Sequence, residues 1–204
     1  MVDKTKTLIA IIGETTQEAV DSILESGYTE IINVVPEGVC KLKNLTTIVS
    51  GDELGFLNLA FSYAKSSKYN YRFIYFMYGF SILNKDILKN LSLEGFYKDA
   101  CSYSNYISTE LGCQSTGKDF RKTESLTSFD PILFRKKNIP VINLLVYIKS
   151  VKNFNYTTPY DFVVGEYQAG NIVYHIPEPL FFTPKNPYEN LNKDILNKYA
   201  KLYI

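Results

Sequence analysis

Short apolar runs recur along the first half of the chain, separated by polar or turn-forming residues. Runs of this length without an alternating pattern predict strands that are covered on both faces, as in a parallel sheet. The first three runs end at turns that contain glycine, which is typical of the point where a strand gives way to a loop. We therefore expect four strands, at Thr7 to Ile12, Glu30 to Val35, Leu45 to Val49 and Tyr71 to Phe76.

Amphipathic segments lie between these strands. Thr15-Thr16-Gln17-Glu18 offers a capping box, and the segment that follows carries apolar residues at helical spacing until Gly27. Glu53 to Ser66 also predicts a helix. The expected apolar faces consist of Ala19, Val20, Ile23 and Leu24 in the first helix, and of Leu57, Ala60, Phe61 and Ala64 in the second. Alternating strands and helices predict right-handed crossovers, with binding loops at the carboxyl ends of the strands.

The second half is less regular, and its elements are predicted one by one. We expect strands at Ala100 to Ile107, Pro131 to Phe134 and Asn171 to Ile176, and helices at Asn84 to Leu91, Val141 to Val151 and Asp161 to Gln168. Gly112 to Ser128 reads as a polar loop. The tail from Tyr188 places apolar residues at helical spacing and lysines on the other faces, so it predicts an amphipathic helix.

Length and composition favour one compact domain. The chain has 204 residues, of which 46% are hydrophobic and 21% charged, enough for one sizeable core and too few for two full domains. We assign residues 1–183 to an α/β domain and residues 184–204 to a C-terminal amphipathic helix that packs on the domain or on a partner.

Charge and rare residues exclude several classes of function. The net charge is +1 and the charges are scattered, so nucleic acid is not an expected partner. The single histidine, His175, excludes a multi-histidine metal site. The three cysteines lack metal-ligand spacing and fit free thiols in a reducing compartment. No secretory signal or membrane span is expected, which favours a cytoplasmic protein or a component of an assembly such as a virus particle.

Three stretches carry a resemblance to a known family. They are Val34-Val35-Pro36-Glu37-Gly38 after the second strand, Gly55-Phe56-Leu57-Asn58 at the second helix, and Gly170 with Ile172-Val173-Tyr174-His175-Ile176-Pro177 near the end. Their order and spacing resemble the family 2 glycosyltransferases. The resemblance implies the GT-A fold, a mixed and mainly parallel sheet flanked by helices, and nucleotide-diphosphate sugars as donors.

The chain departs from the family where the metal binds. The family's fourth strand ends in an Asp-x-Asp motif that holds Mn²⁺ or Mg²⁺, and Tyr78-Gly79-Phe80 stands there instead. Because hard divalent cations need several oxygen ligands, no metal site and no cofactor are expected. Arg72 or nearby lysines could supply a different cationic clamp for a diphosphate.

The catalytic residues of the family are also altered. The acidic pair of inverting members falls near Thr158-Pro159, which leaves Asp161 as the nearest carboxylate that could deprotonate an acceptor hydroxyl. Asp161 fits a helix cap equally well, in the first turn after Pro159. The arginine that often follows in this helix is replaced by Gly165.

Five further residues are candidates for nucleotide binding. Gly13 and Glu14 follow the first strand, and Gly13 fits the required turn as well as it fits a nucleotide contact. Glu37 and Gly38 could contact a base or ribose, or form an ordinary turn. Asn58 faces either the nucleotide pocket or the helix surface.

Two hypotheses from different classes follow. The favoured one is a degenerate transferase domain that serves as a binding or structural module, because metal, base and arginine are lost together. The alternative is an active glycosyltransferase that works without a metal. The implied ligands are a nucleotide-sugar or a glycan, and a protein partner could bind the C-terminal helix or a surface rich in the 17 tyrosines and 13 phenylalanines.

Overall fold

The computed structural model describes residues 6–39, 41–52, 55–83, 100–109, 121–124, 141 and 143–183. Its elements, in chain order, are β1 (Thr7–Ile12), α1 (Gln17–Glu25), β2 (Ile31–Pro36), β3 (Thr46–Ser50), α2 (Phe56–Ser66), β4 (Phe73–Tyr78), β5 (Ile82–Leu83), β6 (Ala100–Thr109), β7 (Arg121–Glu124), β8 (Leu144–Tyr147), a 3₁₀ turn η4 (Ile148–Ser150), α5 (Pro159–Gln168) and β9 (Ile172–Thr183).

The described strands form one mixed sheet in the order β3-β2-β1-β4-β8-β6-β9-β5, and β7 pairs with β6. β1, β2, β3 and β4 are parallel to one another. β8 runs antiparallel to both β4 and β6, whereas β6 and β9 are parallel. The expected α/β fold, with a mixed sheet flanked by helices, is confirmed.

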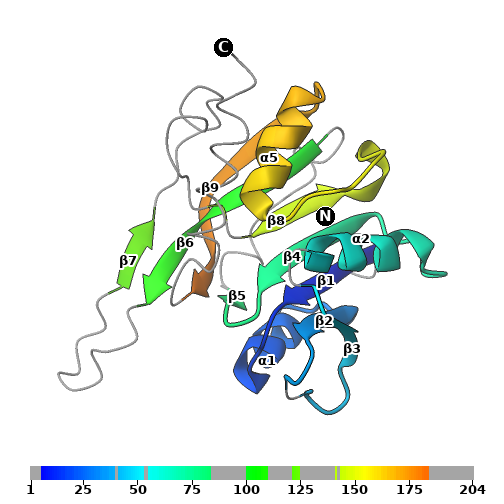
Figure 1. The fold of residues 1–204 in the computed structure, drawn as a ribbon. Helices are drawn as coiled ribbons and strands as arrows, with labels where there is room; N and C mark the ends of the chain where they lie inside the picture. Colours follow the sequence, from blue (N-terminus) through cyan, green and yellow to red (C-terminus); the bar gives the residue numbers. More distant parts are fainter. Residues whose placement is uncertain are drawn as a thin grey trace.

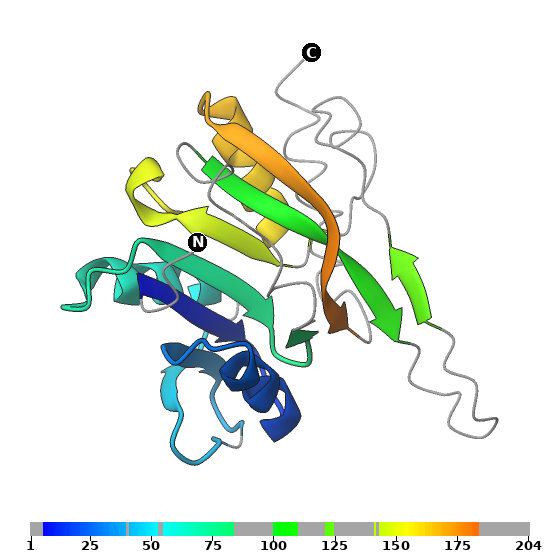
Figure 2. The same ribbon diagram turned by 180° about the vertical axis from the view of Figure 1, so that it is seen from behind.

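The helices cover both faces of the sheet. α2 and α5 lie in front of it in Figure 1, and α1 lies nearer the viewer when the molecule is seen from behind in Figure 2. From β1 the chain moves to β2 on one side of β1 in the sheet. From β3 it crosses back to β4, on the other side of β1. Right-handed crossovers in opposite directions place α1 and α2 on opposite faces. The carboxyl ends of β1 and β4 are therefore the topological switch point, where ligands bind in open α/β sheets.

An aromatic cluster joins the two halves of the sheet on the side of α2 and α5. Phe154 stacks on Phe61 of α2 with ring centroids 4.4 Å apart. The same ring lies 5.6 Å from Phe76 of β4 and 5.2 Å from Phe162 of α5. The segment between η4 and α5 is thus held against both helices by stacked rings, each of which contributes large apolar area.

Most predicted elements of the first half are confirmed, with small shifts. The cap of α1 is Thr16, whose hydroxyl accepts a hydrogen bond from Ala19 N at 3.2 Å, so the capping box expected from Thr15 does not form. Leu24 is 48% exposed although we expected it on the apolar face. Ser22 faces inward in its place and donates its hydroxyl to Ala19 O at 2.7 Å.

Two predictions for the second half are wrong. Val141 to Val151 is not a helix, because Leu144–Tyr147 is strand β8 and Ile148–Ser150 is a 3₁₀ turn. A short apolar run has the same pattern in a buried helix and in a buried strand, and here pairing with β4 and β6 selects the strand. The polar loop expected at Gly112 to Ser128 contains strand β7 at Arg121–Glu124.

The other predictions for this half are confirmed or untested. α5 and the strands β6 and β9 lie where they were expected, and β9 extends further, to Thr183. The helix expected at Asn84 to Leu91, the strand at Pro131 to Phe134 and the C-terminal helix in 184–204 lie outside the described residues. In the part of the chain that is described, no helix has the length and apolar character needed to cross a bilayer.

Candidate functional site at the carboxyl edge of the sheet

The loops after β1 and β4 meet at the switch point, and Gly79 is where they touch. A Cβ atom placed on Gly79 would lie 1.8 Å from the carbonyl oxygen of Glu14 and 3.1 Å from that of Gly13. Gly79 N donates to Ile12 O at 2.9 Å, and the Thr15 hydroxyl donates to Gly79 O at 2.6 Å. Backbone of one loop therefore packs directly on backbone of the other, at the point where an open α/β sheet would admit a ligand.

A buried asparagine fixes the first of these loops. Asn33 is 1% exposed, and its side-chain amide donates to Ile11 O at 3.1 Å and to Gly13 O at 2.9 Å. Gly13 has a φ of +88°, a conformation that glycine adopts without strain. Gly13 thus serves as the turn between β1 and α1. Sequence reasoning missed Asn33, although a lone amide inside the apolar strand 31–36 is a signal for such a role.

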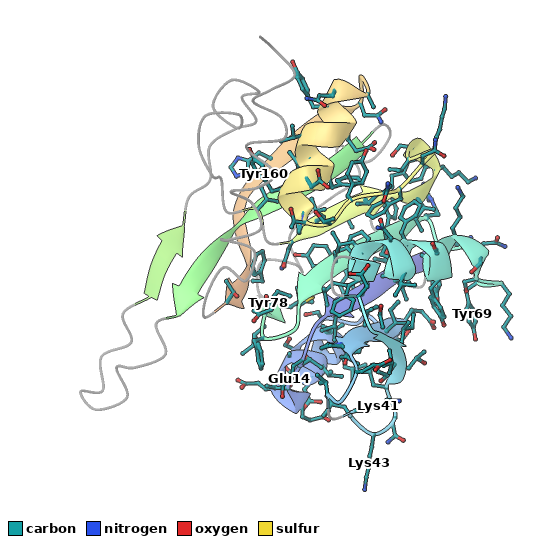
Figure 3. All side chains as sticks on the ribbon, viewed as in Figure 1. Glu14, Lys41, Lys43, Tyr69, Tyr78 and Tyr160 are labelled. Carbon is teal, nitrogen blue, oxygen red and sulfur yellow. The ribbon has the colours of Figure 1, made fainter. Side chains whose placement is uncertain are left out.

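Tyr78 and Phe80 lie at the carboxyl end of β4, at the positions where the resemblance would imply metal-binding carboxylates. Their rings form an edge-to-face pair with centroids 5.7 Å apart, and both residues are half-buried. Figure 3 shows Tyr78 and Glu14 along the same edge of the sheet. Burial and, to a lesser extent, the charge of Glu14 raise the pKa of the Tyr78 phenol. The side chains at this position are therefore a neutral aromatic pair.

Carboxylates follow three of the first four strands. Glu14, Glu37 and Asp52 are all exposed. Glu37 lies beside the next loop, because its Oε1 would be 3.8 Å from a Cβ on Gly51. Among the described residues, however, no three histidine, cysteine or acidic side chains come close enough together to hold a metal ion. An anionic diphosphate at this edge would thus lie near exposed carboxylates of like charge.

Arg72 cannot act as the cationic clamp for a diphosphate at this edge. Arg72 directly precedes β4. Its backbone N donates to Lys6 O at 2.8 Å, and its carbonyl accepts from Ile148 N at 3.0 Å. The guanidinium lies over the Phe73 ring at 5.5 Å. A strand of this length spans about 20 Å, so Arg72 and Gly79 lie at opposite ends of β4.

Asn58 and Asp161 are brought together by the segment that precedes α5. Asn58 Oδ1 accepts a hydrogen bond from Tyr156 N at 3.0 Å. Asp161 Oδ2 accepts from Thr157 N at 3.0 Å, and Asp161 N donates to the Thr158 hydroxyl at 3.1 Å. Asp161 is 2% exposed. Both polar side chains thus hold the chain in place before α5, in the way that reciprocal caps fix a helix start.

Tyr156 fills the space above Gly165, the position where the resemblance would imply an arginine. A Cβ on Gly165 would lie 2.4 Å from Cε1 of the Tyr156 ring. The ring is fixed because its hydroxyl donates to Glu166 Oε1 at 2.6 Å, and Glu166 Oε2 accepts from Asn171 Nδ2 at 2.6 Å. Phe162 packs on the same ring edge to face, at 5.0 Å. This position admits no side chain while Tyr156 holds its place.

Two buried polar atoms beside Tyr78 have no hydrogen-bond partner in the described structure. They are Ser81 Oγ, in a residue that is 0% exposed, and Asn143 Nδ2, in a residue that is 2% exposed. Asn143 Oδ1 accepts a hydrogen bond from Tyr78 N at 3.2 Å, so this amide sits at the end of β4. Buried polar groups are normally satisfied, which marks this spot as suited to a polar ligand atom or a buried water.

No protein-family model matches the chain, and no curated protein sequence matches it significantly. Solved structures do match along nearly its whole length. HddC from Yersinia pseudotuberculosis aligns over 95% of this chain and 99% of its own, with a TM-score of 0.51 and 9% identity. The inositol-1-phosphate CTP transferase from T. maritima aligns over 96% of both chains, with a TM-score of 0.51 and 11% identity. The chain shares the fold of a nucleotide transferase. These matches confirm the α/β transferase fold that the resemblance implies. Membership of family 2 stays a prediction.

Removing the Asp161 carboxylate should lower stability. We expect Asp161→Ala to reduce the free energy of unfolding by about 1–3 kcal/mol, because two donors of Thr157 lose their acceptor in a buried setting. Urea denaturation followed by circular dichroism measures the change. Asp21→Ala is the control, since Asp21 is exposed and accepts only from Gln17 in the same helix, and it should shift stability by less than about 0.5 kcal/mol. Equal effects of the two substitutions would contradict the capping role.

Proposed function

We propose that this protein is a degenerate family 2 glycosyltransferase domain that has lost metal-dependent catalysis and acts as a binding or structural module. Three positions of the family's chemistry have taken up packing roles. Tyr78-Gly79-Phe80 replaces the metal carboxylates, Asp161 accepts from Thr157 N just before the α5 cap Thr158, and Gly165 lies beneath Tyr156. Each of these residues makes ring, hydrogen-bond or packing contacts with its neighbours. These contacts support a change of role at all three positions together.

The contact at Gly79 carries this proposal. Donor sugars would be expected at the switch point between β1 and β4, where the backbones of the two loops are in direct contact. Residues that a transferase would use to hold a diphosphate are replaced there by aromatic rings, with Glu14 beside them. Among the described residues directly after the first four strands (13–16, 37–39, 51–52 and 79–83), no basic side chain would offset the charge of a nucleotide.

Calorimetric titration tests the proposal directly. The full chain is titrated with UDP, GDP and their sugars, once with Mn²⁺ and once with EDTA. We expect no heat of binding in either condition. Binding that requires Mn²⁺ would refute the loss of the metal site. Micromolar binding that survives EDTA would contradict the loss of nucleotide binding and favour a metal-independent transferase.

The unpartnered atoms at the end of β4 favour that metal-independent transferase as the second candidate. Ser81 Oγ and Asn143 Nδ2 could donate hydrogen bonds to a phosphate or sugar oxygen without a metal. In this candidate Glu37 contacts the base or ribose. If nucleotide binding is found, Glu37→Gln should weaken it at least several-fold, whereas Asp21→Asn, a charge change on exposed α1, should leave it unchanged.

As a module, the domain would act through its surface in a larger assembly, in the cytoplasm or in a virus particle. A glycan or a protein partner are the ligands that this role implies. The aromatic residues and the amphipathic segment 184–204 are the candidates for that contact. The assignment of residues 1–183 to the domain stays a prediction, and so does the packing of segment 184–204 on the domain or on a partner.

A further inference from the structure

β3 forms one end of the described sheet and pairs there only with β2. An edge strand presents unpaired N–H and C=O groups along its outer side, and natural proteins commonly block such edges with charges, proline or bulges. The five residues of β3, Thr46-Thr47-Ile48-Val49-Ser50, include none of these devices. Thr46 and Val49 are exposed, and Val49 retains 41% of its accessible surface. The edge is thus open and has the composition that favours strand pairing.

The sequence of β3 is complementary to itself in the antiparallel direction. When two copies pair around a two-fold axis at Ile48, Thr46 lies opposite Ser50, and Thr47 lies opposite Val49. Directly opposed residues point to the same face of an antiparallel pair, so Ile48 meets Ile48 on one face of the joined sheet. The two outer pairs each join hydroxyl residues, and the three inner pairs each join β-branched residues. No like charges are opposed.

Charges at the two ends of β3 strengthen the antiparallel choice. Lys41 and Lys43 precede the strand, and both are exposed. Exposed Asp52 follows it, and exposed Glu37 lies beside Gly51 at the same end. A second copy in the antiparallel direction brings the basic end of each strand to the acidic end of the other, twice by symmetry.

We propose that β3 is a self-association site, through which two copies of this chain join their sheets edge to edge. The occupant of the edge is β3 of the second copy, paired in register about Ile48. The closed two-fold arrangement uses the same surface on both copies and leaves neither β3 edge open for further growth. Because only short strands meet, the dimer is of the weak class and depends on protein concentration.

Matched charge variants test the register. In this pairing, Thr47→Lys/Val49→Lys places two lysines opposite each other on each side of the axis, whereas Thr47→Lys/Val49→Glu places lysine opposite glutamate. Sedimentation of the full chain over a series of micromolar concentrations should show wild type moving from one chain mass toward two. The lysine–lysine variant should stay at one chain mass, and the lysine–glutamate variant should associate at least as strongly as wild type. Circular dichroism verifies that both are folded.

Hydrogen exchange on the wild-type chain provides a test that needs no variant. Amides within residues 46–50 that point away from β2 should become several-fold more protected as concentration rises, while amides of the interior strand β1 should not change. The proposal is overturned if wild type keeps one chain mass at every concentration, if the lysine–lysine variant associates like wild type, or if the lysine–glutamate variant is also monomeric while folded. Protection that is independent of concentration would overturn it as well.

Discussion

Replacing Gly79 with alanine should lower the free energy of unfolding by about 3 kcal/mol, one of the two largest effects that we expect from a single methyl group in this chain. The new Cβ would lie 1.8 Å from the carbonyl oxygen of Glu14, which is backbone and cannot rotate away. The loop after β1 would have to move, and the hydrogen bond from Thr15 to Gly79 O would be lost with it. Urea denaturation monitored by circular dichroism measures the loss.

Gly51→Ala is the matched control, since it adds the same methyl group to the loop after β3, at the same edge of the sheet. Its Cβ would meet only Glu37 Oε1, at an ordinary contact distance of 3.8 Å. We expect a change below about 0.5 kcal/mol there. If Gly79→Ala were as mild as Gly51→Ala, the two loops would not be in contact, and the proposed closure of the switch point would have to be abandoned.

Gly165→Ala should destabilise the protein by about 1–2 kcal/mol even though alanine is the better helix former. Within a helix the exchange normally gains about 1 kcal/mol. Here the new Cβ would lie 2.4 Å from the Tyr156 ring, which rings of Phe154 and Phe162 and the bond to Glu166 hold in place. The cost of moving that ring outweighs the gain.

A double-mutant cycle identifies Tyr156 as the cause. In a Tyr156→Ala background the obstruction is gone, so Gly165→Ala should become stabilising by about 1 kcal/mol. Tyr156→Phe keeps the ring and removes only the hydroxyl, and Gly165→Ala should remain destabilising in that background. Urea midpoints of the six variants, wild type included, give these differences. The same sign in all three backgrounds would show that the ring does not exclude a side chain at this position.

The first half of the fold could be predicted from the sequence because its signals are local. Short apolar runs, three of which end at turns that contain glycine, predicted β1 to β4, and the helical spacing from Leu57 to Ala64 predicted α2. The second half depends on pairings between distant segments. Val141 to Val151 was taken for a helix, and only its place between β4 and β6 makes it a strand. β7 is a strand because it pairs with β6, and four polar residues give no such signal by themselves.

The candidate site could be predicted in location but not in architecture. The sequence placed Gly13, Glu14 and Glu37 at the carboxyl ends of neighbouring strands, and the structure has them there. It could not show that Gly79 touches Glu14 or that Tyr156 covers Gly165, because each contact joins residues whose separation in the sequence follows no period. The roles of these residues in binding and catalysis stay predictions.

The position of β6 in the sheet determines when its partner strands become available during synthesis. β6 lies between β8 and β9 in the sheet, although both follow it in the chain. About 74 residues separate the end of β6 from the end of β9, and a ribosome that adds about 5–20 residues per second needs about 4–15 s to supply them. During that time, the uncharged strand 100–109 is without its main partners. β7 emerges first, and its Arg121, Lys122 and Glu124 pair alongside residues 106–109. This charged strand is the first partner of residues 106–109 to be synthesised, and its charges oppose pairing of that edge with other chains.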